Sequence, residues 1–395
     1  MFIKQLTRQL KIAHKKRGLD IGRITLKMDI NDNLIVSFRE TVNSNSGFVF
    51  HSYHSQDGKN YWNIICSCMD WISVSIRFLS NNFQLNEDID VRVMQFYSVI
   101  SAIDIVQEAI NQLHRVFFKN HGIPFSKNKE IFKRNKLGLD DNSYFKEIRA
   151  MFGAHPVNLT HHGNEKWYAS WPYDHYKSED STFELRLYSN KVGIEDITFG
   201  VNINDLESFL IQRYEYLSVL EKEIGHQYVS FCKDLAAQPI KLKGSALDDI
   251  LILETESERR INNDYYNGIL YELKKVFTTT LIEKHLKDEE EEFKENLQKL
   301  IKELHDNLQK MCFTDLENNK YIDPDYSYSD IGYSVSKLFN YEFDRNREPL
   351  YDYHMKELDK YSNDRYEFKQ TKNPDQVFLK LKMMLYRMNE EQNSS

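Results

Sequence analysis

The chain has 395 residues, enough for two or three domains that each bury a core. Hydrophobic residues make up 41% and charged residues 28%, and the formal net charge is −8, so the composition is that of an ordinary globular protein without a global signal for nucleic-acid binding. No apolar run approaches the roughly 20 residues of a membrane span, and the four cysteines show neither metal-ligand spacing nor disulfide density. The start of the chain lacks the apolar core of a signal peptide. We therefore expect a cytoplasmic protein with no membrane contact.

Residues 1–57 are predicted to form a small α+β cap. Apolar residues at helical spacing over 2–18 predict a basic amphipathic helix. Alternating residues over 23–30 and 33–39 predict a hairpin, and 47–53 could add a third strand. The helix could contact a polyanion, although solvated basic helices are equally common. Its basic residues are Lys4, Arg8, Lys11, Lys15, Lys16 and Arg17.

Residues 58–240 are predicted to form a helical bundle interrupted by a sheet. Apolar residues recur at helical spacing over 59–81 and again over 88–118, which predicts two long helices. A looser basic connector follows. It ends where Ser143 could cap a shorter helix.

The interrupting sheet is expected at about 165–203, where the periodicity changes from helical to alternating. Asn204 could then cap a long helix over 206–235. Two long helices, a short helix, a sheet and a further helix give a four-helix bundle with a β insertion. The predicted strands are 166–171, 183–188 and 197–202.

Residues 241–395 are expected to form a helical C-terminal domain. The acidic run 288–292 is interpreted as the solvated surface of a helix. Further helices are predicted near 330–340, 349–362 and 374–391.

Arg149 and His155 form the most informative pair of side chains. Six helical steps amount to about 600°, so on an uninterrupted helix the two would lie roughly 120° apart. Gly153 is a natural helix stop, and the residue before a proline, here Pro156, is biased away from helical angles. We therefore expect His155 to leave the helix and fold back toward Arg149. A permanently charged guanidinium beside an imidazole suits chemistry on a phosphate.

This segment resembles the signature of the HEPN superfamily, helical-bundle proteins whose ribonuclease members carry an arginine, four to six residues, and then a histidine. Here five residues separate Arg149 from His155. Residues 148–156 are similar to divergent members from bacterial defence and toxin systems, and the resemblance covers roughly 58–238. It implies metal-independent RNA cleavage without a cofactor and a homodimer with the site at its interface. It also implies a toxin or antiphage role, in which an antitoxin or defence-system protein is a candidate partner.

The side chains fit this chemistry by themselves. His155 could remove the proton of a ribose 2′-hydroxyl, or protonate the leaving 5′-oxygen. Arg149 could hold two phosphate oxygens and offset the charge that builds on phosphorus. Asn158 and Tyr144 are candidate orienting groups. Candidate RNA-binding residues in the basic connector are Lys127, Lys129, Lys133, Arg134 and Lys136.

Several alternatives remain open from the sequence. An arginine and a histidine at a helix end are often a cap and a salt-bridge partner, and the bundle would then be a non-catalytic dimerising or partner-binding module. Arg347 and His354 form a second, looser match to the motif, for which a chance origin is favoured because Pro349 separates them.

Two further clusters have competing interpretations. The first contains histidines that could hold a metal, although a surface loop is favoured because no pair shows zinc-ligand spacing. The second contains aromatic residues that could stack on unpaired bases or pack the insertion against the bundle. The members are His161, His162, Asp174 and His175 in the first cluster, and Trp167, Tyr168, Trp171 and Tyr173 in the second.

Overall fold

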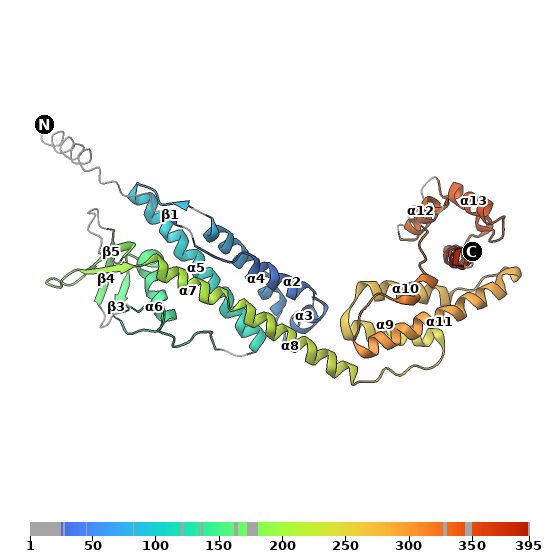
Figure 1. Cartoon of the computed structure of the whole chain (residues 1–395), viewed down its shortest axis with the longest axis horizontal. Helices are drawn as coiled ribbons and strands as arrows, with labels where there is room; N and C mark the ends of the chain where they lie inside the picture. Colours follow the sequence, from blue (N-terminus) through green and yellow to red (C-terminus); the bar gives the residue numbers. More distant parts are fainter. Residues whose placement is uncertain are drawn as a thin grey trace, which may run out of the picture. The chain divides into compact units, whose positions relative to one another are not determined.

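A computed structural model shows a mainly helical protein with a small antiparallel sheet (Figure 1). The chain divides into two compact units, Met1–His226 (unit 1) and Gln227–Ser395 (unit 2). None of the described helices is long and apolar enough to cross a bilayer. The described residues are 25–26, 28–44, 46–81, 83–119, 122–133, 135, 137–161, 165–171, 181–326, 330–343 and 350–393.

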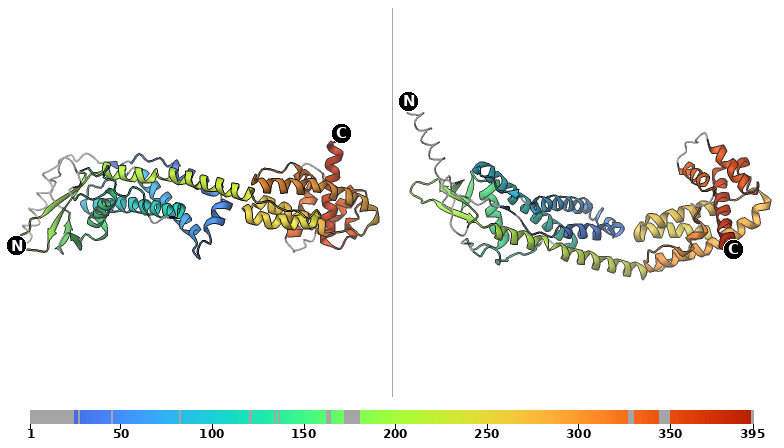
Figure 2. Two further views of the ribbon diagram at one scale, coloured as in Figure 1. Left: turned by 90° about the horizontal axis from the view of Figure 1, so that it is seen from below. Right: turned by 45° about the horizontal axis from the view of Figure 1, so that its top comes forward.

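Three helices lie side by side and form the frame of unit 1 (Figures 1 and 2). They are α4 (Tyr61–Ser80), α5 (Ile89–Phe118) and α7 (Ile203–Tyr214). The two long helices predicted before the connector are thus confirmed. The short helix α6 (Asp141–Arg149) follows the connector and continues directly into a π-helix, Ala150–Ala154.

The strands predicted at 33–39 and 47–53 are wrong. These residues form α2 (Asn33–Ser44) and α3 (Ser46–Tyr53), and both helices pack against α4. The buried residues of α2 follow each other at steps of three and four, so its β-branched residues also satisfy a helical face. Packing against α4 therefore selects the helix over the local preference for a strand. These buried residues are Ile35, Phe38 and Val42.

Only a short piece of an N-terminal sheet occurs among the described residues. β1 (Thr25–Leu26) pairs antiparallel with β2 (Phe83–Gln84), which lies between α4 and α5 in the sequence. The predicted basic helix over 2–18 lies outside the described residues.

The predicted β insertion is confirmed as an antiparallel sheet of order β3-β4-β5-β6. The strands β4 (Glu165–Ser170), β5 (Phe183–Ser189) and β6 (Ile197–Val201) match the three predicted ones, whereas β3 (Leu159–His161) was not predicted. Leu185 is among the alternate residues of β5 that are buried, so one face of that strand contributes to the core of unit 1.

Two predicted caps are displaced along the sequence. Asp140, not Ser143, caps α6, since its side chain accepts hydrogen bonds from the backbone N–H groups of Asn142 and Ser143. Asn202, not Asn204, caps α7. In both cases a short polar residue just outside the helix satisfies its first N–H groups.

The long helix predicted over 206–235 is broken into two. α7 ends at Tyr214, and α8 (Leu217–Ala236) begins after a two-residue interruption. The described chain leaves unit 1 within α8.

A buried polar network holds the connector against the helices of unit 1. The side-chain oxygen of Asn142 accepts hydrogen bonds from Gln107 Nε2 on α5 (3.2 Å) and Arg213 Nη2 on α7 (2.8 Å). Its Nδ2 donates to the carbonyl of Pro124 in the connector (3.3 Å). The neighbouring Asp141 accepts backbone N–H groups of the connector, including that of Phe132 (3.2 Å). The start of α6 is therefore fixed from several sides.

Unit 2 is helical, as predicted, and contains one largely buried helix. Residues 377–386 of α14 are all buried, including Lys380 and Lys382. Each ammonium group is paired, Lys380 with Glu283 (2.5 Å) and Lys382 with Glu272 (2.8 Å). The helices are α9 (Ala246–Ile261), α10 (Asp264–Thr278), α11 (Lys287–Lys310), α12 (Gly332–Phe343), α13 (Tyr351–Tyr361) and α14 (Pro374–Asn393), with 3-10 turns at Lys284–Leu286, Glu317–Tyr321 and Phe368–Gln370.

The acidic run 288–292 is not entirely a solvated surface. Glu290 is buried, accepts the backbone N–H of Leu281 (3.1 Å) and pairs with Lys294 (2.6 Å). Glu289 pairs with Arg365 (2.6 Å). These two carboxylates fix the first turn of α11, because neighbouring segments of unit 2 bind both of them.

Candidate functional site

The π-helix connects the two residues of the predicted catalytic pair. Arg149 is the last residue of α6, and His155 follows the π-helix with φ −142°, outside helical geometry. The backbone N–H of His155 donates to the carbonyl of Ala150 (3.0 Å), the wide turn of a π-helix. His155 thus lies beyond the helix, as expected. Gly153, in contrast, lies inside the π-helix and does not end it.

Gly153 has a packing role at this point. A Cβ atom there would lie 2.6 Å from Cδ2 and 2.7 Å from Cε2 of Tyr97 on α5. The missing side chain therefore allows the π-helix to approach α5 closely. This contact positions the segment between Arg149 and His155.

Arg149 is held by an acidic residue of α5. Its Nε lies 3.1 Å from Oδ2 of Asp104, and the arginine side chain is 46% exposed. Burial raises the pKa of Asp104, while the nearby guanidinium and Lys146 lower it and Glu108 raises it. Because the contact uses Nε, the two Nη groups can face a ligand.

His155 is also exposed, so solvent reaches both members of the pair. Within the described part of the chain, no hydrogen bond or ion pair joins the imidazole of His155 to the guanidinium of Arg149. A polyanion can therefore approach both side chains without a rearrangement of the core.

The two predicted orienting groups have different positions. Asn158 lies close to His155, since its backbone N–H donates to the carbonyl of His155 (3.0 Å), while its side chain accepts from Lys166 Nζ (3.0 Å). Tyr144 is buried and lies five residues before Arg149, about 140° away around the helix axis. It lines a separate pocket, so the structure does not bring it together with the pair.

Three of the five predicted RNA-binding residues lie in the described part of the connector. Lys127 is exposed at a backbone position with φ +71°. Lys129 donates from Nζ to the carbonyl of Gly138 (2.5 Å) and so closes the connector on itself. Lys133 is exposed and lines the same pocket as Tyr144. The remaining two, Arg134 and Lys136, lie outside the described residues.

The other histidine candidates are described only in part. His161 lies opposite Glu165 in the sheet, and the described part of the chain contains no group of three metal-ligating side chains. His354 is 1% exposed, and its Nδ1 lies 3.0 Å from Ser334 Oγ in the core of unit 2. That buried position is unsuited to a phosphate. The candidates outside the described residues are His162, Asp174, His175 and Arg347.

The aromatic residues of the insertion are mostly used in packing. Trp167 is buried, and the ring of Trp171 lies edge-on to Phe152 with centroids 5.5 Å apart. Tyr168 is exposed and is the described member of the cluster best placed to stack on a base. Tyr173 lies outside the described residues.

Sequence reasoning missed Asp104 as the partner of Arg149. The signal available was a single carboxylate within the apolar stretch 102–106 of a long helix, where a charge requires a partner. Lys146, which also belongs to α6, adds a further positive charge near this carboxylate.

Comparison of the chain with protein-family models, with curated proteins and with solved structures finds no match. The resemblance to the HEPN superfamily therefore rests on the motif and its helical context alone.

Proposed function

We propose that the protein is a metal-independent endoribonuclease of the HEPN type, in which Arg149 and His155 act together on a phosphodiester. The observation that carries the proposal is the arrangement of the pair: an exposed arginine held by Asp104 and an exposed histidine stand at the two ends of one π-helix. Single π-turns within helices are frequent at functional sites.

In this reaction the 2′-hydroxyl of a ribose attacks the adjacent phosphorus. His155 accepts the hydroxyl proton, the bond from the 2′-oxygen to phosphorus forms, and the bond to the 5′-oxygen breaks. The products are a 2′,3′-cyclic phosphate and a 5′-hydroxyl, which takes up a proton. Arg149 binds the non-bridging oxygens through its Nη groups, while Asp104 keeps the guanidinium in place.

A second copy of the chain would supply the second imidazole that this acid–base scheme needs. Met94 is 60% exposed and Tyr97 is 39% exposed on α5, and Tyr97 lies against Gly153 of the π-helix. An exposed apolar surface beside the pair suits an isologous contact that brings two pairs into one cleft. We therefore propose a homodimer, and, from the resemblance, a toxin or antiphage effector that an antitoxin or defence-system protein could restrain.

The direct test is RNA cleavage by the full chain with single substitutions. Arg149→Ala and His155→Ala should each lower the rate by about 10²–10⁴-fold, the usual contribution of a general acid–base or a phosphate-binding group. Matched controls are Arg77→Ala and His51→Ala, which remove exposed residues of α4 and α3. Cleavage should persist in chelator. Equal activity of the two site variants and the wild type would contradict the proposal.

The second candidate function is a non-catalytic binding module. The ion pair between Arg149 and Asp104 favours it, because a surface arginine paired with a carboxylate can serve packing alone. RNA cleavage distinguishes the two functions, because a binding module leaves RNA intact in the wild type and in the Arg149 and His155 variants. In that case Asp104→Asn should change only the stability of the fold.

A further inference from the structure

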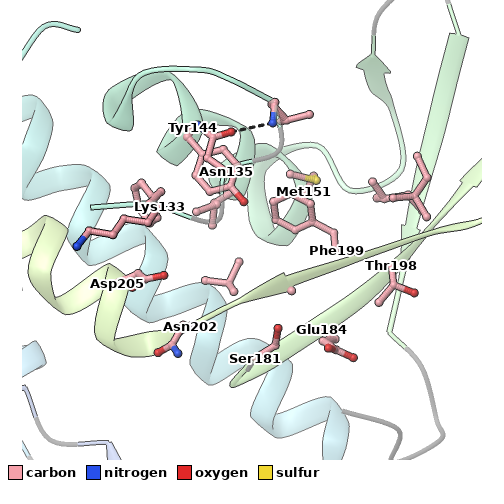
Figure 3. Close-up of a pocket in the computed structure, with 17 residues that line it drawn as sticks. Lys133, Asn135, Tyr144, Met151, Ser181, Glu184, Thr198, Phe199, Asn202 and Asp205 are labelled. Atoms are coloured by element: carbon pink, nitrogen blue, oxygen red, sulfur yellow. Dashed lines mark hydrogen bonds between the residues drawn. The ribbon is translucent and has the colours of Figure 1, made fainter. Parts of the chain in front are cut away.

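A groove of about 750 Å³ lies between the sheet and α6, on the face of α6 that carries Tyr144 and Ile148 and not on that of Arg149. One wall is made by α6 and the π-helix, through Tyr144, Ile148 and Met151. The opposite wall is made by β6 and its neighbour β5 (Figure 3). The volume is in the range of pockets that bind ligands.

The groove runs along a strand that lies at the edge of the sheet among the described residues. In the sheet of the described residues β6 is the outermost strand and pairs only with β5. Residues from both faces of β6 line the groove, Phe199 on one face and Thr198 on the other, together with Gly200 and Val201. A cavity lined by both faces of a strand lies beside its backbone edge. Alternate N–H and C=O groups of such an edge are available for pairing with another chain.

The two sides of this edge differ in chemistry. On the α6 side Met151 and Phe199 lie with Tyr144, Asn135 and Lys133, whereas Ser181 and Glu184 lie on the other side of the strand (Figure 3). Asp205 and Lys133 also line the groove, so that its described lining carries two carboxylates and one ammonium group. The lining is therefore mostly apolar on the α6 side and weakly acidic overall.

We propose that this groove binds an extended segment of a partner protein, which adds to β6 as a further antiparallel or parallel strand. Successive side chains of a strand point to opposite faces, so one set of its side chains would enter the apolar side and the other would reach the side of Glu184. The segment that fits has apolar residues alternating with lysine or arginine. Main-chain hydrogen bonds provide affinity, and the two unlike sides determine the register.

The test is selection of random ten-residue peptides on the full chain, followed by affinity measurement of the enriched peptides. Ile197→Asp places a charge in the groove at a residue that is 40% exposed, and the matched control Ile194→Asp alters a residue that is 44% exposed and outside the lining. Enriched peptides should alternate apolar and basic residues and bind wild type and Ile194→Asp equally. They should bind Ile197→Asp at least about 10-fold more weakly, which corresponds to about 1.4 kcal/mol.

Hydrogen exchange provides the second measurement. A bound peptide should slow amide exchange in residues 197–201, because it pairs with that strand, and a proline in the centre of the peptide should abolish the effect. Absence of enrichment, equal binding to both variants, or unchanged exchange over 197–201 would overturn the proposal. The proposal would also be overturned if no peptide but a random ten-nucleotide RNA bound the two variants with different affinities. The measurements read binding alone, so their outcome is independent of RNA cleavage.

Discussion

Tyr214 is a buried residue whose hydroxyl joins α7 to the start of α2. It accepts the backbone N–H of Ile35 (2.9 Å) and donates to the carbonyl of Asn31 (3.1 Å). Burial raises the pKa of Tyr214 to about 12, from a usual value of 10.0, although the hydrogen bond from Ile35 lowers it. The protonated hydroxyl is therefore retained in the folded state at a pH where the unfolded chain ionises.

The stabilisation from Tyr214 should be fully present below about pH 10 and lost as the pH rises toward 12. Tyr214→Phe should lower the free energy of unfolding by about 1 kcal/mol at neutral pH. Above about pH 10 the wild type alone loses up to about 1.4 kcal/mol per pH unit, so the gap should close and then reverse, with the variant the more stable protein near pH 12. Urea denaturation from neutral to strongly alkaline pH measures this gap. Tyr271→Phe, at an exposed residue, is the control. A gap that stays constant with pH would show that Tyr214 ionises as in the unfolded chain.

The candidate pair itself could be chosen from the sequence, since Arg149, His155 and the helix-breaking context are local features. The residues that surround this pair could not be predicted from the sequence. Asp104 meets Arg149 only because α5 packs beside α6, about 45 residues away in the sequence, and Tyr144 turns away because of its place around the helix. Contacts of this kind depend on tertiary packing, which a local pattern does not contain.

The π-helix depends on one close contact, and this gives a prediction at the scale of the element. Gly153→Ala should displace the π-helix from α5, since the new Cβ would meet the ring of Tyr97. If the pair is catalytic, RNA cleavage should fall by roughly 10- to 100-fold, because small displacements of catalytic groups are costly. The double variant Gly153→Ala/Tyr97→Val removes the ring atoms that meet the new Cβ, keeps an apolar residue on the exposed surface of α5, and should recover most of the rate. A double variant as slow as the single one would show that the contact does not position the pair.

Elements with one dominant periodicity were predictable, and those with two were not. α4 and α5 have long apolar faces that only a helix satisfies, so their bounds agree with the prediction within about two residues. In residues 33–39 both periodicities fit, and only the packing of α2 against α4 decides between them. The short strand β3 carries too few residues to show any alternation. The helical C-terminal region was predictable, whereas the pairing that buries Lys380 and Lys382 was not, because it joins residues about 100 positions apart.

At the scale of the whole molecule, each unit has its own buried polar network. In unit 1 the network is centred on Asn142 and Arg213. In unit 2 the guanidinium of Arg260 is fully buried and donates to the carbonyls of Leu235 (2.9 Å) and Leu308 (3.2 Å). The partners named for each network lie within one unit, so its loss should affect the stability of that unit alone.

We therefore expect the full chain to unfold in two thermal transitions, one for each unit. Asn142→Leu removes the buried acceptor of Arg213 Nη2 and should lower only one transition, by about 3 kcal/mol or roughly 6–12 °C. Arg260→Met should lower only the other by a similar amount, so each variant is the control for the other. Differential scanning calorimetry of the full chain measures both. A single transition that both variants lower equally would show that the two units unfold as one cooperative body.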